Sequence, residues 1–198
     1  MSLAVTLAST SQSRRALLAA AGVEAQTAAP NVDEAAFRDS MRAARLAVRE
    51  QAMQLAELKA MRVSAKQPGL VIGGDQMLAL GDEAVDKPAD MAAAKYHPRR
   101  LSGPAHTLET AIVVCEDGAP IWRHLARPRL TMRPLSEAFI DLYTARCGDT
   151  LLSTVGAYQL EGMGAQLFTR IEGDYFSILG LPLLPLLDYL RVRKVLAS

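Results

Sequence analysis

Short apolar runs separated by turn residues indicate where this chain forms strands. These runs lie at residues 3–8, 70–80, 106–115 and 166–171. A Glu-Asp-Gly turn at 116–118 predicts a hairpin, so that residues 121–132 return along the third strand. The sequence therefore predicts a sheet whose first two strands are buried.

Helical spacing of apolar residues, together with capping residues, predicts the helices. Ser11 can cap a helix at 12–21, because its hydroxyl can accept a free N–H group of the first turn. Further helices are expected at 34–64, after Asp90 with Pro98 limiting the length, at 136–146, and after Pro182. This order predicts an α/β fold, and the sequence has no repeats, low-complexity tracts or linkers, so we predict a single domain, 1–198.

The composition is that of a globular protein, with 50% hydrophobic and 22% charged residues in 198. The formal net charge of +1 gives no bulk electrostatic reason to bind a nucleic acid polymer or an anionic membrane. No apolar run reaches the length of about 20 residues that a membrane-spanning helix needs, and no secretory signal is visible. Cys115 and Cys147 fit neither a zinc spacing nor a disulfide framework, so we expect free thiols and a cytoplasmic location.

The turn between the first strand and the first helix is a candidate phosphate site. Free backbone N–H groups and the positive end of the helix dipole meet there, and Ser9, Ser11 and Arg14 add hydroxyls and a guanidinium. The turn has no Walker sequence. The alternative is that Ser11 only caps the helix and that Arg14 is solvated.

A second candidate is Asp75, which follows Gly73 and Gly74 at the end of an apolar strand. Ligands of α/β proteins usually bind at such a sheet edge, and the glycines would let a ligand approach the backbone. Lys87 supplies a cation after the next turn. The alternatives are a turn aspartate and a solvated lysine.

Two further segments carry polar groups. The three glycines of residues 156–164 surround Tyr158 and Glu161, as in a loop that wraps a ligand or in a flexible hairpin. The carboxylate of Glu34 either favours the start of a helix or holds a divalent ion for a polyphosphate. Lys59 is considered with it as part of the same candidate site. Together, these groups suit phosphoanhydride chemistry.

In their order and spacing, these motifs resemble the Maf family of nucleoside triphosphate pyrophosphatases, over residues 7–190. The segments that carry the resemblance are 7–18 (Leu-Ala-Ser-Thr-Ser-Gln-Ser-Arg-Arg-Ala-Leu-Leu), 32–34 (Val-Asp-Glu), 55–60 (Leu-Ala-Glu-Leu-Lys-Ala), 72–76 (Ile-Gly-Gly-Asp-Gln), 87–88 (Lys-Pro), 101–103 (Leu-Ser-Gly) with His106 and Thr110, 156–162, and 179–183 (Leu-Gly-Leu-Pro-Leu).

The resemblance implies an enzyme that cleaves a nucleoside triphosphate between its α and β phosphates, with Mg²⁺ or Mn²⁺. It implies an α/β fold like that of inosine triphosphate pyrophosphatases, with a bent mixed sheet and two lobes around a nucleotide cleft. The partner is then a small-molecule nucleotide, and a homodimer is compatible with the family, in which dimers are common.

The resemblance also implies roles for single residues. The triphosphate would be bound by Ser9, Ser11, Arg14, Lys59 and Lys87. Glu34 and Asp75 would hold the metal, and Asp75 would be the general base that activates water.

The preferred base is read from three further positions, Ser13, Gln76 and Glu161. Gln76 and Glu161 resemble the branch that acts on N7-methylguanosine triphosphate, and a carboxylate accepts from both donors of a guanine edge. Ser13 is small for stacking on a methylated base, and Ser177 replaces an asparagine common in the family. The alternatives are a pyrophosphatase of the dTTP/UTP type, a non-catalytic nucleotide-binding regulator of septum formation, and an unrelated scaffold whose polar residues are caps and turns.

Overall fold

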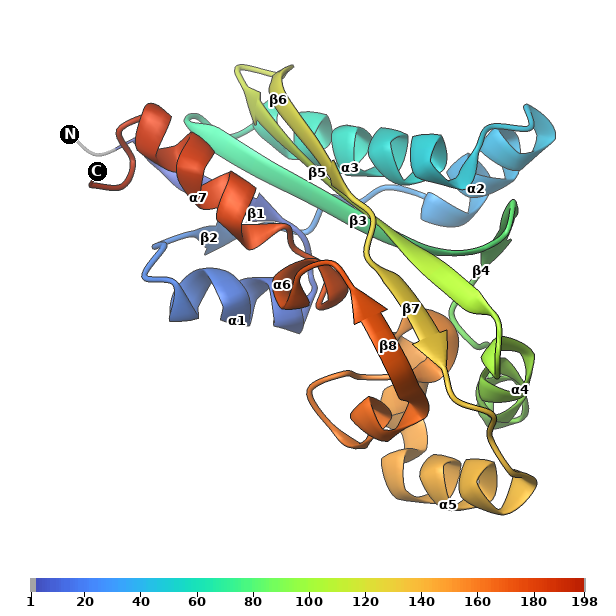
Figure 1. The fold of residues 1–198 in the computed structure, drawn as a ribbon. Helices are drawn as coiled ribbons and strands as arrows, with labels where there is room; N and C mark the ends of the chain where they lie inside the picture. Colours follow the sequence, from blue (N-terminus) through green and yellow to red (C-terminus); the bar gives the residue numbers. More distant parts are fainter. Residues whose placement is uncertain (1–2, 198) are drawn as a thin grey trace. The chain divides into compact units, whose positions relative to one another are not determined.

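The computed structural model describes residues 3–197 (Figure 1). The chain forms two compact units. Unit 1 contains the chain up to Gln76, residues 110–126, and the part from Asp174 onward, and unit 2 contains residues 77–109 and 127–173. Neither unit is one continuous segment, and the single domain stays a prediction.

The predicted α/β class with a mixed sheet is confirmed. The hydrogen-bonded strand order is β2-β1-β3-β5-β7-β8, with β4 on β3 and β6 on β5. The strands are β1 (Val5–Ala8), β2 (Gln26–Thr27), β3 (Leu70–Leu80), β4 (Glu83–Val85), β5 (Ala105–Glu116), β6 (Ala119–Ala126), β7 (Arg129–Met132) and β8 (Phe168–Glu172). β1 is parallel to β2 and β3, whereas the β3–β4, β5–β6, β5–β7 and β7–β8 pairs are antiparallel.

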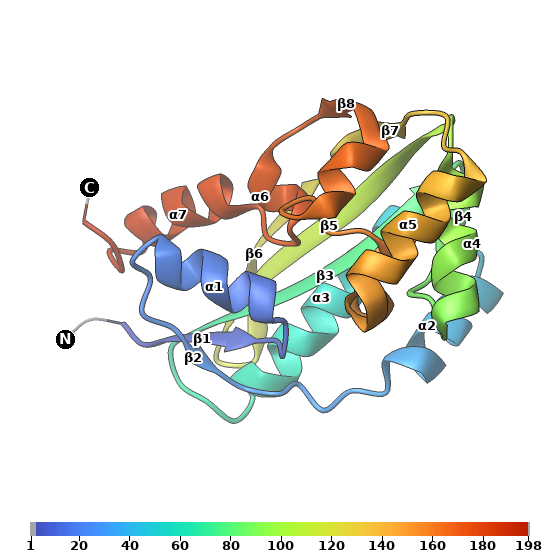
Figure 2. The same ribbon diagram turned by 90° about the horizontal axis from the view of Figure 1, so that it is seen from below.

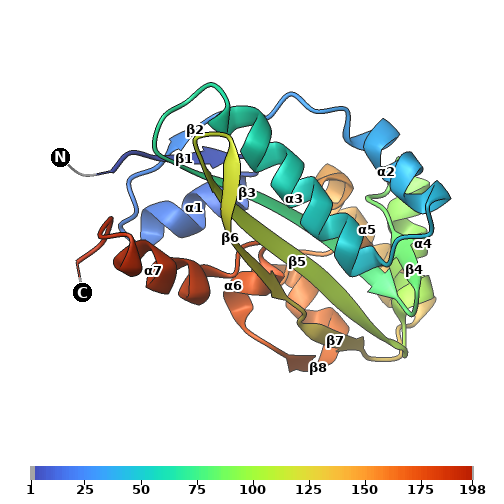
Figure 3. The same ribbon diagram turned by 90° about the horizontal axis from the view of Figure 1, so that it is seen from above.

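In unit 1, helices cover both faces of the sheet. Helices α1 (Gln12–Ala20) and α7 (Leu183–Val192) lie on one face, and α3 (Val48–Ser64) lies along the other (Figures 2 and 3). The alternation of β3 fits this layering. Leu70 and Ile72 join the core cluster with α1 and α7, and Val71 packs in the opposite cluster with Val63 of α3.

Ser11 caps α1 as predicted, with its Oγ accepting from the backbone N of Arg14. The single helix expected at 34–64 is wrong, because the chain forms α2 (Glu34–Ala43) and then α3. Between them Arg45 adopts a left-handed backbone conformation (φ 55°) that no helix continues through. The side chain of Glu50 accepts from the backbone N of Ala47 (3.0 Å), which stabilises the new helix start.

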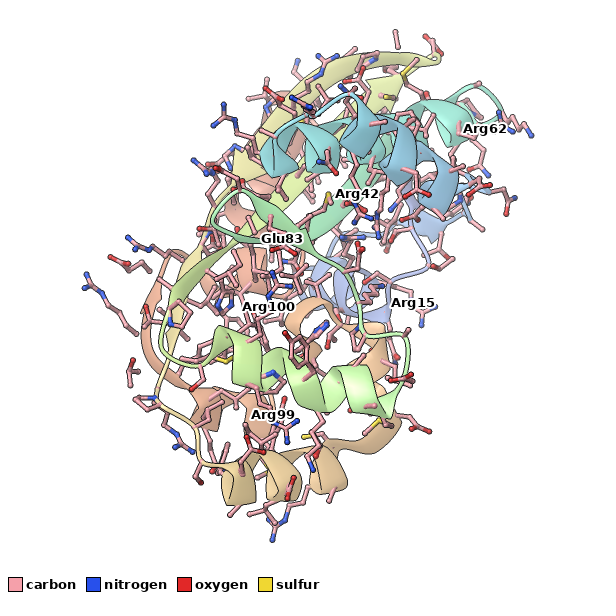
Figure 4. All side chains as sticks on the ribbon, turned by 90° about the vertical axis from the view of Figure 1, so that its right-hand side faces the viewer. Arg15, Arg42, Arg62, Glu83, Arg99 and Arg100 are labelled. Carbon is pink, nitrogen blue, oxygen red and sulfur yellow. The ribbon has the colours of Figure 1, made fainter. Side chains whose placement is uncertain are left out.

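Unit 2 holds α4 (Met91–Leu101), α5 (Glu137–Cys147) and three short 3₁₀ segments, Gly148–Ser153, Val155–Ala157 and Met163–Leu167. Asp90 caps α4 as expected, but the helix continues past the buried Pro98. Arg100 of α4 pairs with Glu83 of β4, and Figure 4 labels both side chains. The hairpin partner expected at 121–132 is two strands, because β6 follows the second half of β5 and β7 follows its start.

The remaining short helix is α6 (Tyr175–Ile178), in unit 1. Within residues 3–197, no helix is long and apolar enough to cross a membrane. Cys115 and Cys147 are free thiols, as predicted.

Candidate active site

The candidate site of unit 1 is built around the middle of β3. Successive residues of a strand point to opposite faces, so Gly73 and Asp75 face α3 while Gly74 and Gln76 face the other layer. Asp75 is buried, with 3% of its surface exposed, and meets Lys59 of α3. The turn aspartate considered from the sequence is therefore wrong.

The β1–α1 turn lies beside this strand. Nε of Arg14 donates to the carbonyl of Gly180 (2.7 Å), and one Nη donates to Oγ of Ser9 (3.2 Å), which also accepts from the backbone N of Ser11 (3.2 Å). Arg14 is 9% exposed, so the solvated arginine is excluded. Burial lowers the pKa of Arg14, and the charges of Asp75 and Glu34 act in the opposite direction.

Four side chains, one in the middle of β3 and the others on α2 and α3, form a charge cluster of Glu34, Arg38, Lys59 and Asp75. Nζ of Lys59 lies 2.7 Å from Asp75 Oδ1 and 2.9 Å from Glu34 Oε1. Arg38 Nη2 lies 3.3 Å from Glu34 Oε2 and 3.8 Å from Asp75 Oδ1. Each cation thus contacts both carboxylates. With Arg14, the site holds three cations against two carboxylates, which favours a polyanionic ligand.

Arg38 is the member of this cluster that sequence reasoning missed. The available signal was its place four residues after Glu34, which puts both side chains on the same face of a helix. Its approach to Asp75, 37 positions further along the chain, depends on how α2 packs and has no local signal.

Gly73 and Gly74 let other parts of the protein pack closely against β3. A Cβ at Gly73 would lie 2.2 Å from the carbonyl oxygen of Ala56 and 2.7 Å from Cβ of Ala60, both in α3. A Cβ at Gly74 would lie 3.1 Å from Nε of Arg14. The expectation that these glycines leave room for a ligand is corrected here, because the protein's own α3 and Arg14 use that room.

Gln76 is fixed by three acceptors. Its Nε2 donates to Oγ1 of Thr110 (2.9 Å) and to the carbonyls of Ser177 (3.0 Å) and Ile178 (3.1 Å). A flipped amide would place Oε1 against two carbonyl oxygens, so the orientation is determined. Ser13, on α1, is half-buried.

The other two predicted site residues, Lys87 and Glu161, belong to unit 2 and are exposed there. The segment that carries Glu161 lies between two short 3₁₀ segments and is no hairpin. The flexible hairpin considered from the sequence is therefore wrong. Tyr143 Oη donates to the carbonyl of Ala157 (3.0 Å), and Gly164 packs so closely on Gln159 that a Cβ would lie 2.3 Å from its carbonyl oxygen.

His106, which is 1% exposed, bonds to Tyr158 Oη through its Nε2 (2.9 Å). Burial lowers the pKa of His106 to about 4. Below pH 6.5 the unfolded chain therefore binds a proton at this residue while the folded chain does not, until the pH falls to about 4.

We expect protonation of His106 in the unfolded chain to lower the unfolding free energy of the wild type by about 3 kcal/mol between pH 7 and pH 4. His106→Gln should not show this loss. The measurement is urea unfolding across this range. His124→Gln is the matched control, since His124 is only half-buried and should follow the wild type more closely. Parallel pH curves for wild type and His106→Gln would contradict the expectation.

The donor set fits a divalent metal ion in part. Carboxylate oxygens are the ligands that Mg²⁺ and Mn²⁺ prefer, and Mg²⁺ is often held by one or two carboxylates plus phosphates. Oδ2 of Asp75 is buried and has no hydrogen-bond partner in the described chain, so it remains open as an acceptor. Among residues 3–197 no group of three or more His, Cys, Asp or Glu side chains is placed to hold a metal, so Glu34 and Asp75 would need ligands from a substrate.

Comparison with known proteins assigns the chain to a family. The family model described as Maf-like protein matches residues 4–193. The chain belongs to the Maf family. A protein of Hyphomonas neptunium named nucleoside triphosphate pyrophosphatase is 84% identical over 198 residues, covering 100% of both chains.

Two more distant relatives have related names. One from Rhodospirillum rubrum, also named nucleoside triphosphate pyrophosphatase, is 52% identical and covers 98% of this chain and 96% of its own. One from Brucella abortus, named 7-methyl-GTP pyrophosphatase, is 49% identical and covers 98% of each chain. The family resemblance predicted from the motifs is confirmed.

Proposed function

We propose that this protein is a nucleoside triphosphate pyrophosphatase that hydrolyses the α–β phosphoanhydride bond and releases a nucleoside monophosphate and pyrophosphate. The observation that carries the proposal is the charge cluster with buried Asp75 at its centre, next to the β1–α1 turn. Family membership and the names of the relatives support the same activity.

In unit 1 the triphosphate is bound by Ser9, Ser11, Arg14 and Lys59. Arg14 brings a guanidinium, and the start of the nine-residue α1 adds N–H groups and the positive end of its dipole. For Lys87 of unit 2, the role of neutralising phosphate charge rests on the Lys-Pro motif of the family resemblance.

Asp75 is the general base. Its Oδ1 is engaged by Lys59, which leaves Oδ2 as the atom that takes the proton of the attacking water. Phosphoryl transfer depends mainly on positioning and on neutralising charge, and the three cations of this site supply both.

Glu34 and Asp75 would hold Mg²⁺ or Mn²⁺. When bound, the ion neutralises phosphate charge and polarises the phosphoryl group. The family as a whole supports this cofactor, as does the pair of carboxylates that Lys59 and Arg38 hold close together.

The substrate base is proposed to be a guanine, in the form of N7-methyl-GTP. Because the amide nitrogen of Gln76 is used by Thr110 and α6, a base would meet its oxygen, an acceptor that suits the donors of guanine. For Glu161 of unit 2, the proposed role of accepting from a guanine and favouring the positive charge of the methylated base rests on its motif alone. Ser13, the third specificity position, is small for stacking on a methylated base.

The experiment is pyrophosphate release by the purified protein with Mg²⁺ or Mn²⁺ and N7-methyl-GTP, GTP, dTTP, UTP, CTP or ATP. Fast turnover of N7-methyl-GTP is the expected result. Preference for dTTP or UTP would keep the enzyme and reject the proposed base. Binding of nucleotides without release from any of them would favour a regulator of septum formation.

Glu161→Gln should shift preference from N7-methyl-GTP toward UTP or dTTP, because an amide offers a donor beside an acceptor, which matches uracil and thymine. The measure is the ratio of kcat/KM for N7-methyl-GTP to that for UTP. Glu172→Gln, also exposed and in unit 2, is the matched control and should leave the ratio unchanged. An unaltered rank order of bases in Glu161→Gln would reject the role of Glu161.

A further inference from the structure

The four members of the charge cluster alternate in sign around a closed ring. Going around it, Glu34 contacts Lys59, Lys59 contacts Asp75, Asp75 contacts Arg38, and Arg38 contacts Glu34, at 2.9, 2.7, 3.8 and 3.3 Å. Two cations therefore already lie between the two carboxylates that would hold a metal ion.

This arrangement opposes the binding of a divalent cation on its own. Like charges repel, and at a few ångströms near a protein surface this repulsion is stronger than in bulk water because the effective dielectric constant is lower. With Arg14 nearby, the site carries an excess of one positive charge. A polyanion is attracted by that excess, whereas Mg²⁺ or Mn²⁺ is repelled.

Of the two cations in the ring, Arg38 is held less tightly to Asp75. Its 3.8 Å separation from Asp75 Oδ1 is an ion pair without a hydrogen bond, whereas Lys59 makes a hydrogen bond of 2.7 Å to the same atom. The side chain of Arg38 is also more exposed, at 20% against 7% for Lys59. Separating Arg38 from Asp75 Oδ1 therefore breaks a weaker contact than separating Lys59 from the same atom.

We propose that Arg38 keeps the metal ion out of the free enzyme, by contacting both carboxylates, and turns to the phosphates when a nucleotide binds. The divalent ion then binds with the nucleotide and not before it. Arg38 is thus a positioning residue for the metal, and this inference rests on the proposed function.

The physical reason is competition between anions. A triphosphate offers Arg38 several oxygens in a geometry that suits a guanidinium, so the arginine can exchange its carboxylates for phosphates. Arg38 then no longer lies against Glu34 and Asp75, the two carboxylates that would hold the ion. By linkage, the nucleotide and the metal must raise each other's affinity by the same factor.

The test measures Mn²⁺ binding by the electron paramagnetic resonance signal of the free ion. The samples are the full chain alone and with an α,β-methylene analogue of GTP that cannot be cleaved. We expect wild-type protein to bind Mn²⁺ weakly alone and, once the Mn²⁺ that the analogue binds without protein has been subtracted, at least roughly tenfold more tightly with the analogue. Without nucleotide, Arg38→Met should bind Mn²⁺ roughly tenfold or more tightly than wild type, because one repelling charge is gone.

Two controls separate this effect from a general change of charge. Arg38→Lys keeps the positive charge and should stay near the wild-type affinity. Arg42→Met removes a charge from the same helix, where Arg42 pairs with Asp39 (3.8 Å), and should also stay near wild type (Figure 4). If Arg38→Met does not fold, Arg38→Gln replaces it.

Equal Mn²⁺ affinity of wild type and the uncharged Arg38 variants would overturn the proposal, as would tight binding of Mn²⁺ by the wild type without nucleotide. An analogue that binds but does not raise Mn²⁺ affinity would also overturn it. The proposed function is tested separately, by pyrophosphate release from the wild type. If no pyrophosphate is released, the comparison of Mn²⁺ affinities without nucleotide still tests the role of Arg38.

Discussion

Asp75→Asn is expected to fold and to lose a factor of about 10²–10⁴ in kcat for pyrophosphate release. Asparagine has the shape of aspartate but cannot take a proton from water, and it adds an amide nitrogen where Oδ2 now stands open. Lys59 and Arg38 keep Glu34 as a partner in this variant, so no buried cation is left without a carboxylate. The chain should therefore retain a cooperative thermal transition.

The measurement is single-turnover pyrophosphate release with saturating nucleotide, so that loss of the chemical step is separated from loss of binding. Asp39→Asn is the matched control, because Asp39 is exposed on α2 and pairs with Arg42. Turnover of a folded Asp75→Asn within a few-fold of wild type would remove Asp75 from the role of general base.

Gly73→Ala should strongly destabilise the folded protein. The new Cβ would meet the carbonyl oxygen of Ala56 at 2.2 Å and Cβ of Ala60 at 2.7 Å, and backbone atoms cannot rotate away as a flexible side chain can. Helix α3 must shift instead, so we expect the unfolding free energy to fall by about 3 kcal/mol, the upper part of the range for overpacked cores. Lys59 lies between Ala56 and Ala60 on that helix, so KM for the nucleotide should rise as well.

Urea unfolding of Gly73→Ala against Gly162→Ala checks the stability effect. At Gly162 the backbone is not left-handed (φ −130°), and a Cβ would come no closer than 3.9 Å to the carbonyl oxygen of Gln159. The control should therefore unfold near the wild-type midpoint. Equal midpoints for the two variants would mean that α3 can move away from β3 without loss of stability, and would contradict the prediction.

Local signals predicted the elements that surround the site. The hydroxyl of Ser11 accepts a hydrogen bond from the backbone N–H of Arg14, three residues further along the chain. Because this contact is local, the cap of α1 could be predicted without any knowledge of the fold. The apolar run of β3 likewise predicted a buried strand, although it placed Asp75 at the strand's end, whereas β3 continues to Leu80. The order of the motifs indicated the family before any geometry was known.

Contacts between distant residues were not predictable in this way. The break between α2 and α3 has no glycine or proline to mark it, and the residue that turns left-handed there is an arginine, Arg45. The contact of Arg38 with Asp75 and the close approach of α3 to Gly73 also depend on packing.

By itself, the sequence determined the residue types available for phosphoanhydride chemistry and the strand and helix starts that carry them, since propensity, capping and strand alternation act over a few residues. Only the tertiary structure decided that Arg14 is buried against Gly180, that Gln76 presents its oxygen, and that two cations lie between Glu34 and Asp75. These features arise where separate elements meet, and the energy of a charge or an amide there depends on burial and on partners far away in the chain.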